Sequence, residues 1–382
     1  MARLKVLYIN THHDLGGASN SLLDMIQSLG ENIDPVVLVP RHGDLEKACH
    51  VRGINCIVYP FSSLVNTLHK TTFREAIRKP WRISYIQRWR QDIPALFKLV
   101  PMLKKMNINL VHTNVSDCTI GMWLAKFLNV PHIWHIRESL TKHFRVEACG
   151  GVPRLLKRIN KADARIAISH ALVSDWSLNK KGTYVINDAV LCKENTYSIL
   201  PKHKYFLFAS FGISKNKGAD IVVEAFGMSG LYSKGYQLIL LGHVHDELKE
   251  ELLKIAQKYE CKDGISFHPF TTEVRPIYEH ATAYIQGSIY EGLGRTTAEA
   301  MFYGCPVIAT AYSGGTLDLI KDHQTGYLFN TVQECASLMN EVVEKDQFEI
   351  CLKAQKWALD NLTIEDYGAK IWEVYKSVIK GL

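Results

Sequence analysis

The sequence predicts an α/β protein built from two doubly wound parallel sheets, one in each half of the chain. Short apolar runs alternate with helix-length segments, a pattern typical of parallel sheets covered by helices on both faces. The alternation stops around residues 188–204 and then starts again. At 382 residues, the chain also suits two domains of about 150 to 200 residues each.

The first half contains six apolar runs of strand length. Helical patterns such as SNSLLDMIQSL and IGMWLAKFL lie between several of them. This order favours buried parallel strands joined by helices. The predicted strands are residues 4–9, 35–39, 56–59, 109–113, 132–136 and 164–168.

The segment DAVLCKENTYSILPKHK, residues 188–204, interrupts this pattern. It loses the apolar periodicity, gains polar residues and contains a proline, all of which are signals of a loop. We therefore interpret it as the linker between two domains, residues 1–190 and residues 191–360.

The second half repeats the alternation of strands and helices. Its helical stretches include KGADIVVEAF and ELKEELLKIAQKY, and consecutive helices are predicted from about Val332 to Lys380. Two Rossmann-like units of this kind imply a cleft between them, because ligands bind at the carboxyl ends of such strands. The predicted strands are residues 205–211, 236–241, 264–268, 282–286 and 305–311.

The composition is that of a globular protein with sizeable cores. Hydrophobic residues make up 47% and charged residues 22% of the chain. No segment approaches the roughly 18 consecutive apolar residues of a membrane span. The start, MARLKVLYIN, predicts a short buried strand rather than a signal peptide. The nine cysteines are scattered without a CxxC pair, which favours reduced thiols in a cytosolic protein over disulfides or a zinc site.

Positive charge is concentrated between His69 and Lys105. This stretch holds ten Lys and Arg residues against Glu75 and Asp92, a net charge of +8, within a chain of net charge +7. Tryptophan, tyrosine and phenylalanine are interleaved with the charges, which fits contact with an anionic membrane surface. The alternatives are a solvated helical hairpin and a site that binds an acidic substrate. No nucleic-acid recognition motif accompanies the patch, so we expect no nucleic-acid partner.

The stretch SIYEGLGRTTAEAM, residues 288–301, has the features of a phosphate-binding turn. A glycine-rich turn between a strand and a helix presents free amide N–H groups and the positive end of the helix dipole. Arg295 adds a positive charge, and Glu291 and Glu299 can accept hydrogen bonds from sugar hydroxyls on either side. The alternative for Glu299 is a capping box with Thr296, in which it only satisfies the helix start.

The stretch from residue 288 to residue 329 strongly resembles the signature of the retaining GT-B glycosyltransferases of family four, the glycosyl transferases group 1, of the type found in bacterial polysaccharide biosynthesis. Those enzymes carry two glutamates separated by seven residues, an EAM-x-x-G-x-PVIA run, a GG-x-x-(Glu/Asp) turn and a TG-x-L hairpin. Each part has a counterpart here, in the same order. The matching residues are Glu291, Glu299, Ala300, Met301, Gly304, Pro306, Val307, Ile308, Ala309, Gly314, Gly315, Asp318, Thr325 and Gly326.

The resemblance implies a GT-B fold, with two Rossmann-like domains facing a central cleft, and roles for the turn. In that family the first glutamate contacts the donor sugar and the second binds the nucleotide ribose. Glu291 is therefore the expected catalytic residue, and Glu299 is expected to bind the donor. Backbone amides of the turn meet the donor phosphates. The expected contacts there are Leu293, Gly294, Arg295 and Thr296.

Two further loops resemble the family's donor site less closely. The loop HHDLGG, residues 12–17, follows the first strand and precedes a helix expected near Ser19. Its paired glycines, Gly16 and Gly17, let the backbone approach a donor, unless they form an ordinary tight turn. In the second domain, Lys217 is followed by glycine, as in the family's phosphate-binding segment. Lys217 is expected to bind the diphosphate rather than to be an exposed first-turn lysine.

The arginine of that phosphate-binding segment has no counterpart in this chain. Phe211 and Gly212 stand where the family has Gly and Arg. A charge-assisted contact of this kind is worth roughly 1.5–3 kcal/mol. Lys215, Arg295 or a residue of the first domain could take its place.

The stretch NVPHIWHIRESL parallels a family strand that usually ends in a histidine reaching the donor sugar. Arg137 occupies that position in this chain, with Glu138 after it. Arg137 is our second candidate catalytic residue, holding a sugar hydroxyl or a phosphate oxygen. It could equally form an ion pair with Glu138 or another neighbour.

The resemblance implies an enzyme that moves a sugar, with retention, from a nucleoside-diphosphate donor to a hydroxyl of a glycan or a lipid-linked acceptor in the synthesis of cell-surface polysaccharide. The donor would be linked to UDP or GDP. Residues 1–190 would serve the acceptor and residues 191–360 the donor, and a helix within residues 361–382 would cross back to the first domain.

The chain contains no DxD motif, so we expect metal-independent transfer with no cofactor. The expected location is the cytoplasm, on the inner face of the membrane if residues 69–105 bind it. The alternatives are a non-catalytic nucleotide-sugar-binding subunit of a synthesis complex, a GT-B sugar-nucleotide epimerase and a phosphorylase.

Overall fold

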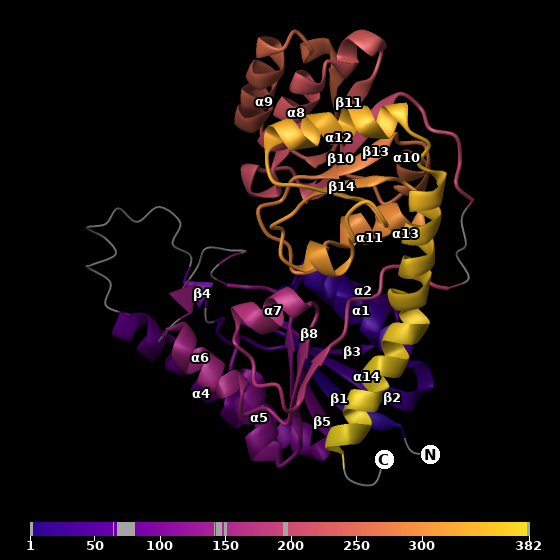
Figure 1. The fold of residues 1–382 in the computed structure, drawn as a ribbon. Helices are drawn as coiled ribbons and strands as arrows, with labels where there is room; N and C mark the ends of the chain where they lie inside the picture. Colours follow the sequence, from indigo (N-terminus) through magenta and orange to yellow (C-terminus); the bar gives the residue numbers. More distant parts are fainter. Residues whose placement is uncertain are drawn as a thin grey trace. The chain divides into compact units, whose positions relative to one another are not determined.

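The computed structural model divides into two compact units (Figure 1). The first comprises Met1–Ala189 and Ile364–Leu382, and the second comprises Val190–Thr363. The second unit is thus inserted into the first. The residues described are 3–63, 65–66, 81–140, 142, 147–148, 151–193 and 198–379.

The first unit is built on a parallel sheet of seven strands, in the order β3-β2-β1-β5-β6-β8-β9. Central β1 pairs Ile9 with Leu38 of β2 and with Thr113 of β5. The strand β9 was not predicted, because its three residues are too few for an apolar run and none of them is buried. The strands are β1 Leu4–Ile9, β2 Ile33–Val39, β3 Asn55–Val58, β5 Leu110–Thr113, β6 His132–Ile136, β8 Ala164–Ala167 and β9 Thr183–Val185; β4 Val65–Asn66 and β7 Glu147–Ala148 form a separate antiparallel pair.

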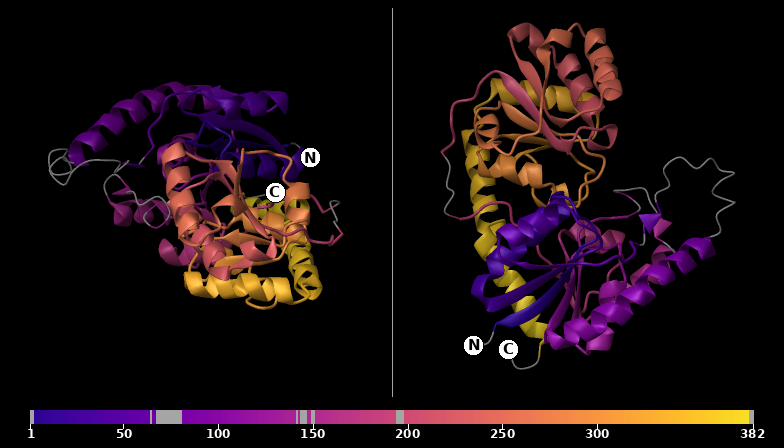
Figure 2. Two further views of the ribbon diagram at one scale, coloured as in Figure 1. Left: turned by 90° about the horizontal axis from the view of Figure 1, so that it is seen from above. Right: turned by 180° about the vertical axis from the view of Figure 1, so that it is seen from behind.

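Helices cover both faces of the first sheet, which explains the unbroken apolar runs of its strands. The helices lie on the two sides of the sheet (Figure 2). Alternate residues of β1 point to opposite faces: Val6 and Tyr8 pack in the core that contains α1 and α14, and Leu7 and Ile9 pack in the core that contains α4 and α5. The helices are α1 Gly17–Leu29, α2 Asp44–Val51, α4 Trp81–Lys105, α5 Ile120–Leu128, α6 Val152–Ile159, α7 His170–Asp175 and α14 Ile364–Val378.

The second unit has a parallel sheet of six strands, in the order β12-β11-β10-β13-β14-β15. The predicted α/β class with two parallel sheets is confirmed. The three-residue β15 was not predicted as a strand. The strands are β10 Tyr205–Gly212, β11 Gln237–His243, β12 Ile265–His268, β13 Ala283–Gln286, β14 Val307–Thr310 and β15 Tyr327–Phe329.

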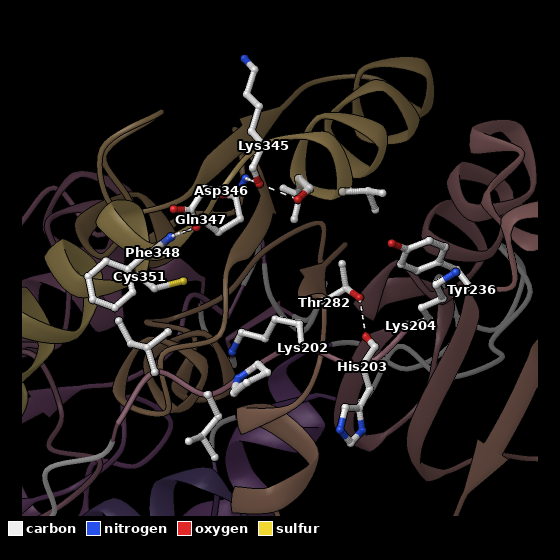
Figure 3. A pocket seen from close by; sticks show the side chains of 15 residues that line it. Lys202, His203, Lys204, Tyr236, Thr282, Lys345, Asp346, Gln347, Phe348 and Cys351 are labelled. Atoms are coloured by element: carbon white, nitrogen blue, oxygen red, sulfur yellow. Dashed lines mark hydrogen bonds between the residues drawn. The ribbon is translucent and has the colours of Figure 1, made fainter.

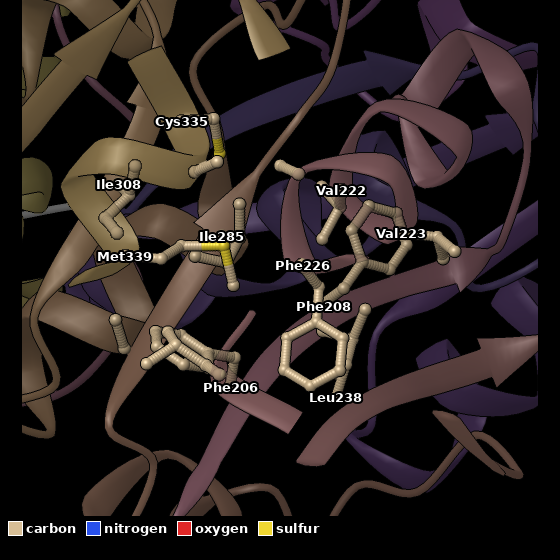
Figure 4. Close-up of a cluster of buried hydrophobic side chains, with 14 of the residues drawn as sticks. Phe206, Phe208, Val222, Val223, Phe226, Leu238, Ile285, Ile308, Cys335 and Met339 are labelled. Atoms are coloured by element: carbon tan, nitrogen blue, oxygen red, sulfur yellow. The ribbon is translucent and has the colours of Figure 1, made fainter. Parts of the chain in front are cut away.

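Aromatic and branched side chains fill the core between this sheet, α8 and α12. Phe206 of β10 contacts Phe226 of α8 edge to face, and Met339 of α12 completes the same cluster (Figure 4). The strands are fixed from both sides, so the loops at their ends start from rigid positions. The helices are α8 Ala219–Ser229, α9 Asp246–Lys258, α10 Arg275–Glu279, α11 Arg295–Phe302, α12 Val332–Glu344 and α13 Phe348–Asn361.

Candidate functional site

The loops that follow β10 and β13 meet at the carboxyl edge of the second sheet. The strand order reverses between these two strands, which is where ligands of doubly wound sheets bind. Gly218 has a φ of +73° and packs so closely on Gly287 that a β-carbon on either residue would collide with the other's backbone. Ile289 N donates to Asn216 O over 3.1 Å. The two loops therefore form one continuous surface.

The loop after β14 completes this surface by holding the backbone of Glu291. Gly315 N donates to Glu291 O over 2.9 Å, and Glu291 N donates to Ser313 O over 3.3 Å. Gly314 has a φ of +58°, and a β-carbon there would lie 2.6 Å from Glu291 O. Glu291 is thus fixed by its neighbours before any ligand arrives.

The side chains of Lys217 and Glu291 meet across these loops. Lys217 Nζ lies 2.7 Å from Glu291 Oε1, with the lysine side chain 28% and the glutamate side chain 15% exposed. Ser288 Oγ donates to the same carboxylate oxygen over 2.6 Å. The structure therefore brings together two residues that were predicted from separate motifs. Ser288 was missed, although it lies only three residues before Glu291.

The helix α11 begins at Arg295, and Gly294 is its N-cap with a φ of +99°. The capping box proposed for Thr296 and Glu299 is wrong, since the N-cap makes no side-chain hydrogen bond and Thr296 already lies within the first turn. Instead the Thr296 hydroxyl lies 2.7 Å from the hydroxyl of Tyr284. Left-handed backbone at Gly294 starts the helix one residue earlier than the threonine signal suggested.

The residues expected to meet the donor phosphates surround this helix start. Leu293 is buried, and Arg295 and Glu299 are half-buried on the first turns of α11. Lys215, one possible replacement for the missing arginine, pairs with Glu251 of α9 over 2.5 Å at the surface. Gly212, which stands where the family has arginine, ends β10 beyond an irregularity in its pairing with β11.

Three aromatic rings gather at the carboxyl ends of β10, β11 and β12. Phe211 and Phe270 are 62% and 42% exposed, and each contacts the ring of His243, with centroids 5.3 Å and 5.7 Å apart. Exposed aromatic faces of this kind can stack on a flat ring. This cluster could not be predicted from the sequence, because its members come from three separate segments.

In the first unit, the glycine loop, defined as residues 12–17, leads directly into α1. The helix begins at Gly17 with Gly16 as its N-cap, two residues before the predicted start near Ser19. Neither glycine has a positive φ, and no atom lies within 4 Å of a β-carbon placed on Gly17. The protein itself therefore leaves open space beside Gly17.

The guanidinium of Arg137 is bound within the first unit. It is 5% exposed and forms an ion pair with Asp188, rather than with Glu138. Its Nε donates to Asn114 Oδ1 over 2.9 Å, and its Nη2 donates to the Tyr367 hydroxyl over 3.2 Å. Burial alone would lower the pKa of Arg137, but Asp188 and Tyr367 together more than offset this and raise it, so the side chain stays charged.

Glu138 points elsewhere and was not predicted as a site residue. The residue is 6% exposed, and its carboxylate accepts a hydrogen bond from Ser116 N over 2.7 Å. Burial, and then the charge of Asp117, raise the pKa of Glu138 to about 7. The carboxyl group therefore changes charge near neutral pH.

The sequence of the second unit carries the decisive likeness to known proteins. Residues 195–357 match the family described as Glycosyl transferases group 1. An uncharacterized glycosyltransferase of Haemophilus influenzae is 25% identical over 297 residues, which cover 74% of this chain and 79% of that protein. Residues 195–357 thus form a group 1 glycosyltransferase domain, and the chain is a glycosyltransferase. The family and the enzyme class predicted from the sequence are confirmed.

More distant comparisons extend this picture to the whole fold. The poly(glycerol-phosphate) alpha-glucosyltransferase of Bacillus subtilis is 22% identical over 259 residues, 66% of this chain and 36% of that protein. The crystal structure of Anabaena HepE in complex with UDP and glucose matches with a TM-score of 0.77 at 18% identity, covering 98% of this chain and 100% of that chain. The fold of this glycosyltransferase is GT-B.

A pocket of about 410 Å³ lies at the opposite, amino edge of the second sheet of the glycosyltransferase (Figure 3). It is lined by residues that precede β10, β11 and β13, such as Lys202, Tyr236 and Thr282. Lys202 Nζ donates to the carbonyls of Glu279 and Gly304, each over 2.8 Å. Its charged group thus serves to join backbone segments, and the pocket is separate from the Lys217 loops.

Among the residues that the structure describes, no group of three or more His, Cys, Asp and Glu side chains could hold a metal ion. None of the described helices has the length and apolar character needed to span a bilayer.

Proposed function

We propose that this glycosyltransferase moves a sugar, with retention, from a nucleoside-diphosphate donor to a hydroxyl of a glycan or lipid-linked acceptor in cell-surface polysaccharide synthesis. The observation that carries the proposal is the Lys217–Glu291 pair at the switch point of the second sheet. It places a cation and a carboxylate side by side, next to the start of α11. The presence of UDP and glucose in the HepE structure supports a sugar nucleotide as the donor.

In this proposal the protein stabilises the departing diphosphate with fixed charge. Lys217, Arg295 and the amides of Leu293 and Gly294 face the phosphates, and preorganised donors of this kind lower the barrier without reorganisation. Glu291 orients the sugar through its hydroxyls, in place of its present contact with Lys217. Glu299 accepts hydrogen bonds from the ribose.

The proposed reaction uses no protein nucleophile. As the bond from the sugar to the phosphate breaks, the oxygen of the incoming hydroxyl forms a bond to the same carbon, on the face that the phosphate leaves. The departing phosphate takes the proton of that hydroxyl. The name of the Bacillus subtilis relative, an alpha-glucosyltransferase, supports retention for donors that are themselves alpha-linked. Fixed cations take the place of a divalent metal, so transfer is expected to continue in the presence of a chelator. Loss of turnover with chelator, restored by a divalent cation, would contradict metal independence.

The base of the donor is proposed to stack on Phe211 or Phe270. Stacking of a base on an aromatic side chain is worth about 1–3 kcal/mol and tolerates any base. Either UDP or GDP therefore fits this cluster. Phe211→Ala and Phe270→Ala should each weaken binding of the nucleotide that the wild type binds.

The decisive experiment compares Lys217→Met and Glu291→Gln with the wild type in transfer from UDP- and GDP-linked sugars. Each variant is expected to lower kcat/KM by about 10- to 100-fold, since a charge-assisted contact is worth roughly 1.5–3 kcal/mol. Lys345→Met is the matched control, because Lys345 forms a similar 2.8 Å ion pair with Glu341 on the exposed face of α12. Unchanged rates in both site variants would exclude this site.

We propose further that the enzyme works in the cytoplasm against an anionic membrane surface. The basic segment 69–105 carries this proposal, although residues 69–80 lie outside the described part of the chain. In α4, Phe97 is 79% exposed beside Lys98, as expected of a side chain that enters a lipid interface. The protein should sediment with vesicles that contain anionic lipid and not with neutral vesicles. Equal binding to both would contradict an electrostatic contact.

A further inference from the structure

A network of buried polar side chains runs through the first unit. Each member is at most 5% exposed, and buried polar groups of this kind are stabilised by hydrogen bonds. They come from segments far apart in the sequence, including the ends of β1, β5 and β6. The members are Asn10, Ser19, Ser21, Asn114, Arg137, Asp188 and Tyr367.

Arg137 is the centre of this network, since it donates to three partners on three different segments. Nε binds Asn114 after β5, Nη1 binds Asp188 and Nη2 binds Tyr367 of α14. The fork of a guanidinium fixes the angles between its partners. The three segments are therefore held in one geometry.

One branch of the network leads to the glycine loop. Asn114 Nδ2 donates to Asn10 Oδ1 over 3.0 Å and to Ala18 O over 3.1 Å. Asn10 Nδ2 in turn donates to His12 O over 2.8 Å and to Ser19 Oγ over 3.1 Å. Both the start of the loop and the first turn of α1 are bound by these two amides.

The other branch leads to the paired connection, defined as residues 189–191 and 362–364, where the chain passes between the two units. The two segments run side by side: Val190 N donates to Leu362 O over 3.0 Å, and Leu191 pairs with Thr363. Asp188 lies just before the first segment and Tyr367 just after the second. The Tyr367 hydroxyl donates to Asp188 Oδ1 over 3.3 Å, so both segments are anchored at one point.

We propose that Arg137 is a positioning residue that couples the glycine loop to the paired connection. The proposal rests on the proposed function only in treating the glycine loop as part of the donor site. Ser21 adds a second link, because its hydroxyl donates to Asp188 Oδ2 over 2.9 Å from within α1. A displacement of Asp188 or Tyr367 breaks bonds to a buried charge unless Arg137 moves with it. A shift of Arg137 then displaces Asn114 through their hydrogen bond, and Asn114 in turn displaces Asn10 and the loop.

The test measures amide hydrogen exchange in Tyr367→Phe. This variant removes the hydroxyl that binds Arg137 and Asp188 but keeps the ring in the core. Exchange should accelerate about fivefold or more in peptides that cover the glycine loop, as well as in those that cover the paired connection. Faster exchange confined to α14 and the paired connection would overturn the coupling.

Tyr375→Phe is the matched control on the same helix. Its hydroxyl lies 3.0 Å from the Tyr8 hydroxyl and 2.8 Å from His112 Nδ1, and it makes no contact with Arg137 among the described hydrogen bonds. When Tyr375→Phe and Tyr367→Phe are compared at the same loss of global stability, Tyr375→Phe should leave exchange of the glycine loop unchanged. Equal acceleration of the loop in both variants would show a merely structural effect and would also overturn the proposal.

A second variant, Asn114→Ala, cuts the branch between Arg137 and Asn10. In this background Tyr367→Phe should change exchange of the glycine loop less than it does in the wild type, because only the link through Ser21 remains, a non-additivity that reports coupling through the shared partner. Additive effects would contradict a path through Arg137. No nucleotide is present in these measurements, whereas binding of UDP or GDP to the wild type tests the proposed function. Failure of either proposal is therefore visible separately.

Discussion

Gly17 is the first residue of α1 and Gly218 is the N-cap of α8, yet they are glycines for different physical reasons. At Gly218 the positive φ and the contact with Gly287 exclude any side chain. At Gly17 the backbone is ordinary and the space beside it is open. If the donor site includes the glycine loop, only a ligand needs Gly17 to be small.

Gly17→Ala should therefore leave the fold intact but impair catalysis. Alanine at a compatible helical position stabilises a protein by about 0.4–1 kcal/mol, mainly through the unfolded chain. We expect equal or higher stability in urea unfolding and a fall in kcat/KM of about tenfold or more, because a methyl group would displace the donor. Wild-type activity in this variant would remove Gly17 from the donor site.

Glu138 predicts a specific dependence of stability on pH. Its folded pKa of about 7 lies above the ordinary value of 4.5. Between these values the folded state binds more protons than the unfolded state, so stability falls as the pH rises. The negative charge of Asp117 raises the pKa of Glu138 and so strengthens this trend, whereas a positive charge on His12 lowers that pKa and opposes it.

Glu138→Gln should flatten this dependence. Between pH 5 and pH 7.5 the wild type is expected to lose up to about 3 kcal/mol of unfolding free energy relative to the variant. The comparison isolates Glu138, since the buried histidines, such as His132 with its pKa lowered by burial to about 3, are the same in both proteins. Parallel stability curves would show that Glu138 titrates as an ordinary carboxyl.

At the scale of elements, the contact between α1 and α14 depends on one small residue. Gly368 lies inside α14, and a β-carbon there would lie 2.5 Å from Ser28 O of α1. The two helices can approach closely only because this position has no side chain. Ile371 and Tyr375 then extend the contact into the core of the first unit.

Gly368→Ala should destabilise the first unit, although alanine has the higher helix propensity. Forcing an extra methyl group into a packed contact costs typically about 1–3 kcal/mol. Gly17→Ala is the control, since it is the same exchange in the partner helix at an open position. Calorimetry should show opposite shifts in the unfolding midpoint of the two variants. A stabilised Gly368→Ala protein would mean that the helices separate easily.

The sequence predicted elements best where the backbone is regular. Continuous apolar runs identified the long central strands, because burial on both faces demands them. The starts of α1 and α11 were each placed too late, by two residues and one residue. Both helices begin with glycine N-caps, whose geometry depends on tertiary contacts rather than on a capping side chain.

At the scale of the whole molecule, the candidate site was predictable only where its motifs are local. Glu291 and Lys217 each belong to a short recognisable segment. The partners of Arg137 could not be predicted, because Asp188 and Tyr367 lie 51 and 230 residues away in the sequence. An arginine at the end of a strand is compatible with either a ligand or an ion pair until the fold supplies its neighbours.

A nucleotide that binds the folded protein alone should stabilise it according to its affinity. At one hundred times its Kd, UDP or GDP is expected to add about 2.7 kcal/mol to the unfolding free energy. A thermal-shift series with both nucleotides would identify the base, and Lys217→Met should reduce the shift. If neither nucleotide raises the midpoint, the donor carries a different base or binds elsewhere.

The insertion of the second unit within the first has a consequence for biosynthesis. The core of the first unit includes side chains of α14, which the ribosome makes only after all of Val190–Thr363. During translation one apolar face of the nascent first sheet therefore stays uncovered until α14 has been made. The inserted unit has all of its strands before that point. The first unit, although most of it is made first, should thus acquire its native structure last. It is the part of the nascent chain that most needs a chaperone.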